Sequence, residues 1–359
     1  MVYFAGLIIL LICCRVKESK KHYKPLILLL TGILVWGIFS FRASTVGTDT
    51  RSYLIYFRML EDTPISIQLF TGNTNDIFSK SSGWVILFKL IGDLFGYTDS
   101  IYLLFSGLLV VPVFFIIIGN FSQDYRVSLL LFYLIFFLPS MNGTRTFMAL
   151  GLVFLSGILI LWQKQKILPF LILIPAFFIH KIALVGVIID FLFLIRWNKK
   201  RVKIAIIASI AATLLIPKLI EYFVTIFPEY RYSLIEEVPV AGKNIVYQVA
   251  YITLFVYAYR VSKQNRFRKK EGQRFNGLLM ILLIEIVIGI VGWKTWYLQR
   301  INYFFQIYIL ILAPAVFHNK IKYRNIYKII VYSVFAAGFF YTILANKSEI
   351  MPYRTWLFN

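Results

Sequence analysis

The chain has 359 residues, of which 60% are hydrophobic and only 15% are charged. Soluble domains are about half apolar and about a quarter charged, so this composition indicates a membrane protein. The formal net charge of +22 would suggest nucleic acid in a soluble protein, but in a membrane protein such an excess orients the helices, and we expect no nucleic-acid partner. The two cysteines, Cys13 and Cys14, lack metal-ligand spacing, and nucleotide- and zinc-binding motifs are absent, so we expect no metal and no cofactor.

The apolar residues are gathered into runs close to the roughly 20 residues that cross a bilayer as a helix. These runs cover about residues 1–14, 25–41, 101–119, 127–139, 146–162, 167–179, 182–195, 202–220, 245–260, 275–292, 301–317 and 328–345. We therefore predict an all-α polytopic membrane protein with about twelve transmembrane helices in a single integral membrane domain, residues 1–359. A further run, Trp84 to Phe95, is short and carries Lys89 and Asp93, which favours a re-entrant or interfacial helix.

The distribution of charge predicts which side each connection faces. If Met1 lies outside, the connections that fall in the cytoplasm are 15–24, 120–126, 163–166, 196–203, 260–274 and 318–328. They hold 24 of the 38 Lys and Arg residues but only three acidic residues, in agreement with the positive-inside rule. We expect both termini and the two larger loops, 42–100 and 221–244, on the outer face.

The segment FRASTVGTDTRSYLIYF interrupts the apolar pattern directly after the second run. It offers Arg42 and Asp49 as charged groups together with several small hydroxyls, and Gly47 lets the backbone turn. After Thr50, apolar residues beginning with Tyr53 recur at helical spacing, which predicts an amphipathic helix. A polar, Gly-hinged segment at the mouth of a membrane span favours the binding of a charged and hydroxylated ligand.

Further basic and aromatic residues fall on the predicted outer face. They are Arg145 after a tight polar turn, His180 and Lys181 at the tip of a hairpin of two short helices, Tyr297 and Arg300 in the loop WKTWYLQR, and Arg354 in the tail. Guanidinium groups bind phosphate oxygens bidentately, so convergent Arg residues at a membrane surface predict a phosphate or pyrophosphate site. The alternative is that these aromatic and basic side chains only anchor helix ends at the interface.

Three titratable residues are candidates for proton transfer. His180 suits a general acid or base, although a lone His also serves as a hydrogen-bond partner. Asp49 lies in a Gly-Thr-Asp-Thr turn close to Arg42. Glu285 lies in the middle of a span, where an acid is a proton relay, the partner of a buried base, or a neutral group hydrogen-bonded within the bundle; we favour the last.

Five short motifs follow one another along nearly the whole chain. They are R-x4-GTD-x3-Y-x3-F from Arg42, R-x3-A from Arg145, FFIHKIALVG around His180, QRINYFF around Arg300, and the late MPYR that ends at Arg354. In these motifs the chain resembles the bacterial exopolysaccharide and O-antigen polymerases of the EpsG/Wzy-like group. It departs from them at Ser81-Ser82-Gly83-Trp84, where an acidic residue common in the group ahead of a Gly-Phe/Trp pair is absent.

The resemblance implies a glycosyltransferase of the bacterial cytoplasmic (inner) membrane, which joins oligosaccharide repeat units carried on undecaprenyl pyrophosphate at the outer face without using a nucleotide. In such an enzyme Arg145 and Arg300, supported by Arg42, stabilise the departing pyrophosphate, and either His180 or Asp49 removes the proton of the acceptor hydroxyl. The further binding residues that we expect are Lys181, Tyr53, Tyr297 and Arg354. The expected partners are the lipid-linked oligosaccharide, membrane lipids and a regulator of chain length.

The main alternative is a transporter or flippase of lipid-linked oligosaccharides, because about twelve spans with basic residues fit that class too. Transporter folds usually contain internal repeats and broken helices in matching positions, and the sequence has no such pairing. A membrane acyltransferase is the third alternative. Such an enzyme would be expected to place its polar catalytic residues deeper in the membrane, and to contain more of them than this sequence does.

Overall fold

A computed structural model of the chain describes residues 1–15, 23–63, 81–163, 167–226, 241–264, 267, 269–293, 295–319, 321–346 and 348–358. Over these residues the regular structure is helical, and the only β pairing is one isolated bridge between Arg42 and Thr355. Parts of the two larger loops, residues 64–80 and 227–240, fall outside the described residues. For the part of the chain that is described, the predicted all-α fold is confirmed.

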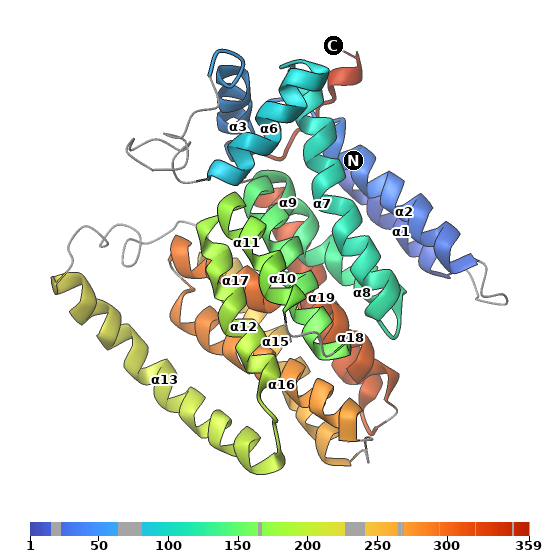
Figure 1. The fold of residues 1–359 in the computed structure, drawn as a ribbon. Helices are drawn as coiled ribbons and strands as arrows, with labels where there is room; N and C mark the ends of the chain where they lie inside the picture. Colours follow the sequence, from blue (N-terminus) through green and yellow to red (C-terminus); the bar gives the residue numbers. More distant parts are fainter. Residues whose placement is uncertain are drawn as a thin grey trace.

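The first helices place the predicted amphipathic segment at one end of the molecule. Helix α1 packs on α2, α2 packs along α7, and α3 and α6 cover the upper end in Figure 1. The bounds are α1 Val2–Arg15, α2 Tyr23–Ser40, α3 Thr48–Met59, α6 Ser82–Phe95 and α7 Asp99–Phe121. Helix α3 is the predicted amphipathic helix, begun two residues earlier than expected, and α6 is the predicted short helix.

Helix α10 is central to the bundle. It contacts α7, α11, α12 and α17, and most of its side chains are buried, so its first turn, which carries Arg145, has a fixed position. Helices α11 and α12 form the predicted hairpin, with a short 3-10 turn after its tip. The bounds are α8 Tyr125–Leu131, a π-helical segment Phe132–Phe137, α9 Leu138–Asn142, α10 Thr144–Gln163, α11 Leu168–Ile179, the 3-10 turn η2 Lys181–Leu184 and α12 Val185–Leu194.

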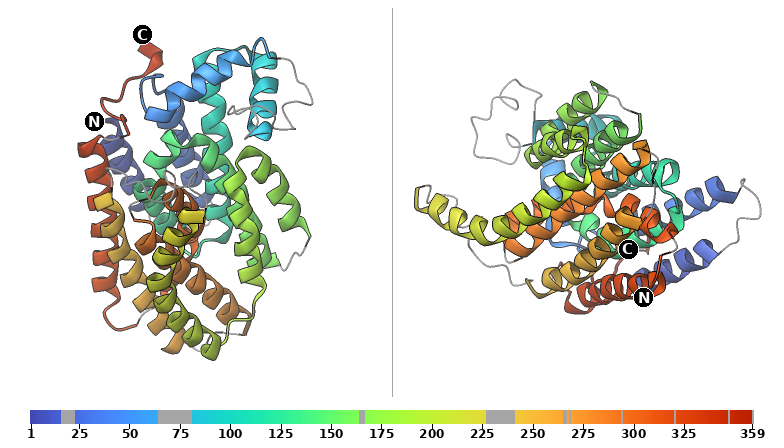
Figure 2. Two further views of the ribbon diagram at one scale, coloured as in Figure 1. Left: turned by 90° about the vertical axis from the view of Figure 1, so that its left-hand side faces the viewer. Right: turned by 90° about the horizontal axis from the view of Figure 1, so that it is seen from below.

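The C-terminal half supplies the remaining wall of the bundle. Helix α15 packs between α16 and α19, α13 flanks the bundle and contacts α16, and α17 and α18 form one path bent by 43° (Figures 1 and 2). The bounds are α13 Lys199–Ile226, α15 Ala241–Gln264, α16 Lys269–Val291, α17 Trp296–Gln306, α18 Ile309–His318 and α19 Arg324–Ala345.

Each predicted apolar run coincides with a helix, but the predicted count of about twelve transmembrane helices is not confirmed. Within the described residues, seven helices are long and apolar enough to cross a membrane, or eight if the bent pair α17–α18 is one span. Helices α1, α11 and α12 have 14, 12 and 10 residues, well short of the roughly 20 that a crossing needs. The set is still that of a multi-pass membrane protein.

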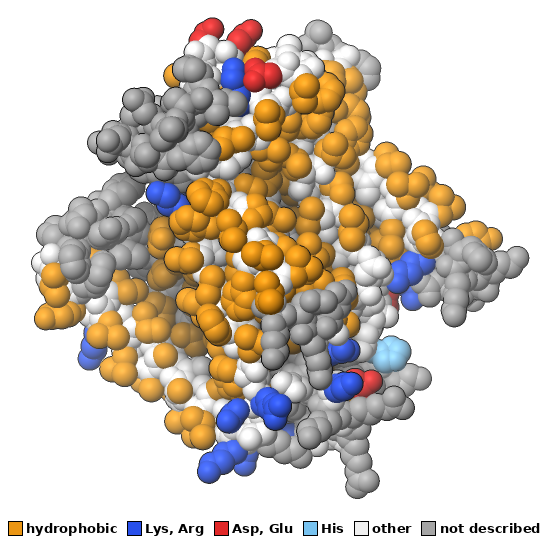
Figure 3. All heavy atoms as spheres, viewed as in Figure 1, with side chains coloured by type: hydrophobic (Ala, Val, Ile, Leu, Met, Phe, Trp, Pro, Cys, Tyr) orange, Lys and Arg blue, Asp and Glu red, His pale blue; other side chains and the backbone are white. Residues whose placement is uncertain are grey.

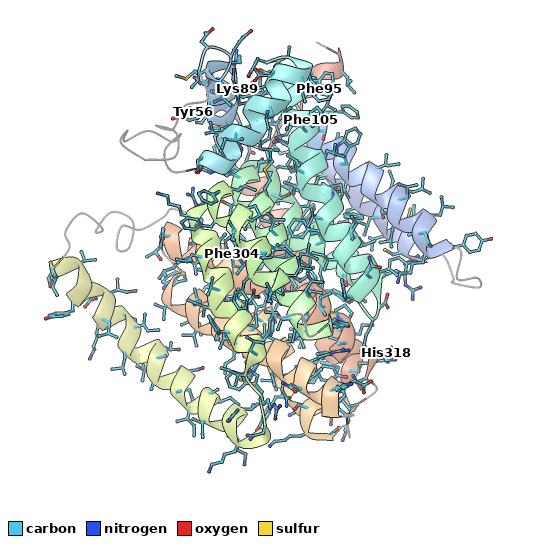
Figure 4. All side chains as sticks on the ribbon, viewed as in Figure 1. Tyr56, Lys89, Phe95, Phe105, Phe304 and His318 are labelled. Carbon is cyan, nitrogen blue, oxygen red and sulfur yellow. The ribbon has the colours of Figure 1, made fainter. Side chains whose placement is uncertain are left out.

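The two ends of the bundle differ in charge. On the face seen in Figure 3, Lys and Arg gather mainly at the lower end, most of the visible Asp and Glu lie near α3 and α6 at the upper end, and a broad apolar belt lies between them. His318 lies at the lower end, whereas Tyr56 and Lys89 lie at the upper end, which also carries both termini (Figures 2 and 4). The positive-inside rule predicts that the lower end faces the cytoplasm, and this sidedness stays a prediction.

Candidate functional site

The polar turn between α2 and α3 is held in place by the C-terminal segment. The main-chain N–H of Gly47 donates to the carbonyl oxygen of Glu349 at 3.0 Å. Gly47 has φ +100°, and a Cβ there would lie 2.7 Å from the hydroxyl oxygen of Thr50, so both the backbone and the available space require glycine. This turn starts α3 at Thr48 and puts Asp49 in its first turn, where a negative charge is favourable.

Asn142, the last residue of α9, fixes the start of α3. Its Oδ1 accepts hydrogen bonds from the main-chain N–H of Asp49 at 2.8 Å and from the hydroxyl of Thr48 at 3.1 Å. The first N–H groups of a helix have no partner within the helix, so Asn142 provides a cap from a distant segment. The contact joins two turns that lie 93 residues apart, and the second of them leads into Arg145.

Arg145 lies in the first turn of α10 and contacts α3 and the segment that begins α6. Its Nη1 donates to Ser81 Oγ at 2.7 Å, and its guanidinium lies 6.0 Å from the ring centroid of Tyr53. Tyr53 belongs to a buried aromatic cluster with Trp84 and Tyr102. Because Ser81 and Tyr53 are both uncharged, they do not cancel the positive charge of Arg145.

His180 lies between α11 and η2, at the tip of the hairpin, and is 9% exposed. Its Nδ1 accepts a hydrogen bond from the main-chain N–H of Ile182 at 3.4 Å, so the neutral ring carries its hydrogen on Nε2. Burial and the nearby charges of Arg145 and Arg300 lower the pKa of His180 to about 3. The imidazole is therefore neutral at physiological pH.

Arg300, on α17, completes the group. Helix α17 contacts α10 and η2, and the charge of Arg300 acts on the pKa values of Asp49 and His180. Burial raises the pKa of Asp49, and the charges of Arg300 and Arg145 partly oppose that rise. Asp49, Arg145, His180 and Arg300 thus form one charged cluster, which is assembled from α3, α10, the hairpin tip and α17.

Arg42 is enclosed in the protein interior instead of joining the charged cluster. Its side chain is fully buried, its Nη2 donates to the carbonyl oxygen of Met141 at 3.0 Å, and its Nη1 donates to that of Phe39. Its main chain forms the bridge to Thr355. A direct contact between Arg42 and pyrophosphate does not fit this enclosure. Arg42 instead ties α2 to α9 and to the C-terminal segment.

The other predicted binding residues differ in exposure. Lys181 is exposed and Tyr297 is 44% exposed, so both can reach a ligand at the surface. Tyr53 is only 8% exposed and uses its ring to support the neighbouring guanidinium. Arg354 is exposed, and its carbonyl oxygen accepts a hydrogen bond from the N–H of Ala43 at 2.8 Å, which fixes the C-terminal segment.

A profile of the EpsG family matches residues 2–355, almost the whole chain. The chain belongs to the EpsG family. The resemblance inferred from the motifs is therefore confirmed, and membership implies a polymerase or glycosyltransferase type of role connected with exopolysaccharides. No curated protein and no solved structure gives a significant match.

The departure of this EpsG-family chain from the group's motif falls at the charged cluster. Ser81 stands just ahead of the Gly83-Trp84 pair, in the stretch where an acid is common in the group, and it accepts the hydrogen bond from Arg145. A hydroxyl in place of a carboxylate leaves the charge of Arg145 available for an anionic ligand.

Glu285, on α16, is fully buried and hydrogen-bonded within the bundle. One carboxylate oxygen, Oε1, accepts from the side-chain amides of Gln248, Asn302 and Gln306 at 3.1, 3.2 and 3.2 Å. Asn302 and Gln306 belong to α17, the helix of Arg300, and Gln248 belongs to α15. A cavity of about 30 Å³, enough for a water molecule, adjoins these amides. The group joins three helices and sets the position of α17.

The sequence analysis missed Asn142 and Ser81 as site residues, because a single amide or hydroxyl leaves no periodic signal. The amides of α17 did leave one, since Gln299, Asn302 and Gln306 recur at helical spacing in an otherwise apolar segment. Among the described residues, no three His, Cys, Asp or Glu side chains are grouped as a metal site would need.

Proposed function

We propose that the protein is a membrane glycosyltransferase that polymerises undecaprenyl-pyrophosphate-linked oligosaccharide repeat units into O-antigen, capsule or exopolysaccharide. The reaction takes place on the outer face of the bacterial cytoplasmic membrane and uses no nucleotide. The observation that carries the proposal is the convergence of the charged cluster from four distant segments, at the end of the bundle opposite most Lys and Arg. Membership of the EpsG family supports the same class of activity.

In this proposal Arg145 and Arg300 bind the pyrophosphate of the donor. Negative charge grows on the pyrophosphate as it leaves, and guanidinium groups that are already in position stabilise it most strongly at that stage. Lys181 and Tyr297 are exposed close to these residues in the chain, so they contact the outer part of the pyrophosphate or the first sugars. Arg42 and Arg354 hold the surrounding segments and act on the reaction through them.

We assign the role of general base to Asp49 and that of hydrogen-bond donor to His180. Burial makes the Asp49 carboxylate more basic, whereas the Nδ1 of His180 already accepts a main-chain hydrogen bond and Nε2 carries a hydrogen. The acceptor hydroxyl attacks the anomeric carbon of the donor and gives its proton to Asp49. The bond between that carbon and the pyrophosphate oxygen breaks, and undecaprenyl pyrophosphate leaves with the electron pair.

The test is a reconstitution with purified protein, vesicles and undecaprenyl-pyrophosphate repeat units, without nucleotide. We expect longer lipid-linked glycans, detected by electrophoresis or mass spectrometry. Movement of unchanged units between leaflets without elongation would overturn the polymerase and support the flippase. Addition of a candidate chain-length regulator should then change the length of the product but not the requirement for the charged cluster.

A further inference from the structure

A groove between α6 and α11 begins beside the charged cluster. It has a volume of about 460 Å³ and is lined entirely by apolar residues, among them Leu87 and Leu90 on α6 and Ile174 and Phe178 on α11. Leu90, Ile174 and Phe178 are 49%, 53% and 44% exposed, so they present a large apolar surface. Volumes of this size are typical of small-molecule sites in proteins.

The end of the groove nearest the cluster is defined by close contact of the two helices. Gly83 lies in the first turn of α6, and a Cβ there would lie 2.9 Å from the main-chain carbon of Phe178, so the absence of a side chain lets α6 touch α11. Gly83 and Ile179 both line the groove. Ser81, which binds Arg145, is two residues from Gly83, and His180 directly follows Ile179.

We propose that this groove holds the isoprenoid tail of the lipid substrate while Arg145 and Arg300 hold its pyrophosphate. This inference rests on the proposed function and adds the location of the tail. An apolar groove whose end lies next to His180 and to Ser81, the hydrogen-bond partner of Arg145, is complementary to a lipid with an anionic head and a long hydrocarbon chain. The tail of a lipid in the bilayer is already out of water, so the groove contributes by close packing against the chain and by aligning it with the head-group site.

A second apolar groove, between α2 and α7, provides an internal comparison. It is larger, about 780 Å³, but the basic residue in its lining is Lys24, at the start of α2 and at the opposite end of that helix from the turn that leads to Asp49. Both grooves can hold hydrocarbon, yet only the α6–α11 groove adjoins the charged cluster. The α2–α7 groove therefore suits ordinary phospholipid chains.

Photo-crosslinking tests the proposal without requiring catalysis. Benzoylphenylalanine replaces Ile174 in the α6–α11 groove or Leu29, which is 59% exposed, in the α2–α7 groove. The protein is placed in phosphatidylethanolamine–phosphatidylglycerol vesicles with undecaprenyl pyrophosphate that carries no sugar. We expect an isoprenoid adduct at position 174 and phospholipid adducts at position 29. Replacing both Arg145 and Arg300 by Ala should lower the isoprenoid adduct at least about tenfold, because two charge-assisted contacts to the head group are lost.

Kinetics provide a second readout with a matched control. Ile174→Trp fills the groove. Ile188→Trp makes the same change on α12, outside the groove, at a side chain of similar exposure: Ile188 is 57% exposed and Ile174 is 53% exposed. We expect Ile174→Trp to raise the KM for the full-length lipid donor about tenfold, and to raise the KM for a donor with a ten-carbon tail only slightly. Ile188→Trp should change neither KM value. Two results would overturn the assignment of the groove as the tail site. One is that position 174 forms phospholipid adducts only, and the other is that its isoprenoid adduct is unaffected when Arg145 and Arg300 are replaced. Isoprenoid capture without glycan elongation would instead keep the groove and reject the polymerase.

Discussion

At the scale of single residues, Asp49 and His180 share one electrostatic environment and respond to it in opposite directions. Burial disfavours the charged form of each, so it raises the pKa of Asp49 and lowers that of His180. The charges of Arg145 and Arg300 oppose the first change and reinforce the second. The result is a carboxylate made more basic than usual beside a neutral imidazole, which separates the roles of base and hydrogen-bond donor.

The pH dependence of chain growth distinguishes the two candidate bases. A base works only when deprotonated, so with Asp49 the rate falls as pH drops through a pKa above the ordinary value of about 3.9. His180 has a pKa of about 3 and stays neutral from pH 5 to pH 8, so it adds no inflection near 6.5. We expect Asp49→Asn to lower kcat/KM by about 10²–10⁴-fold, and His180→Gln to leave the midpoint of the acid limb unchanged. A midpoint near 6.5 that disappears in His180→Gln would assign the base to His180.

Two arginine substitutions separate a contact with substrate from a structural contact. Arg145→Ala should lower chain growth by about 10²-fold or more, because stabilisation of the leaving group is lost, while membrane insertion and thermal unfolding stay near wild type. Arg42→Ala should lower the free energy of unfolding by about 3 kcal/mol, because it removes a buried donor from the carbonyl oxygen of Phe39 and leaves that of Met141 with only the longer hydrogen bond from the Thr144 hydroxyl, at 3.4 Å. Both are measured by glycan length and by Tm in detergent. Wild-type glycan lengths with Arg145→Ala would remove Arg145 from the site.

The four members of the charged cluster could be proposed from the sequence because each polar side chain interrupts a long apolar pattern at a predicted outer turn. Their neutral hydrogen-bond partners could not be identified in this way. Ser81 and Asn142 have the same appearance as any polar residue in a loop, and their roles depend on contacts with residues 64 and 93 positions away. The burial of Arg42 could not be predicted for the same reason, since the sequence does not reveal that main-chain carbonyl groups and the C-terminal segment surround it.

At the scale of elements, α17 links the outer site to the bundle interior. Its outer part carries Tyr297 and Arg300, and its inner part carries Asn302 and Gln306, which donate to Glu285 on α16. Helix α17 is bent relative to α18, so it does not have the support of one straight span. We therefore expect the carboxyl group of Glu285 to help fix the placement of Arg300 through these two hydrogen bonds.

Substitutions of Glu285 test this link. Glu285→Gln keeps the accepting oxygen, and its new N–H group can donate to Asn302 Oδ1 or Gln248 Oε1, which have no hydrogen-bond partner among the described residues. Tm and chain growth should therefore change little. Glu285→Leu leaves two buried donors, Gln248 and Asn302, and the partly buried Gln306 without this acceptor, and should lower the free energy of unfolding by about 3 kcal/mol. In that variant we also expect a higher KM for the lipid donor, because Arg300 is displaced. Lost activity in Glu285→Gln with an unchanged Tm would instead indicate a proton-transfer role.

At the scale of the whole molecule, the apolar pattern predicted where the helices lie along the chain better than it predicted which of them are long enough to cross the membrane. Continuous apolar residues form a helix whether it crosses the bilayer or turns back, so runs such as 167–179 were counted as spans although α11 has only 12 residues. The break at His180 could be located, but its depth depends on how the hairpin packs against α10 and α6. Sidedness, in contrast, is predicted from the distribution of Lys and Arg in the connections, and it stays a prediction until it is measured.

The sidedness can be measured with single cysteines in a background in which Cys13 and Cys14 are replaced by Ser. Ser52 on α3 and Lys322 between α18 and α19 are both exposed, and they lie at opposite ends of the bundle. With a membrane-impermeant maleimide, Ser52→Cys should react in intact spheroplasts and Lys322→Cys only after lysis. The expectation follows from the basic residues of 318–328, which the positive-inside rule keeps in the cytoplasm. The opposite labelling pattern would put the charged cluster on the cytoplasmic side, where a polymerase acting on exported repeat units has no substrate.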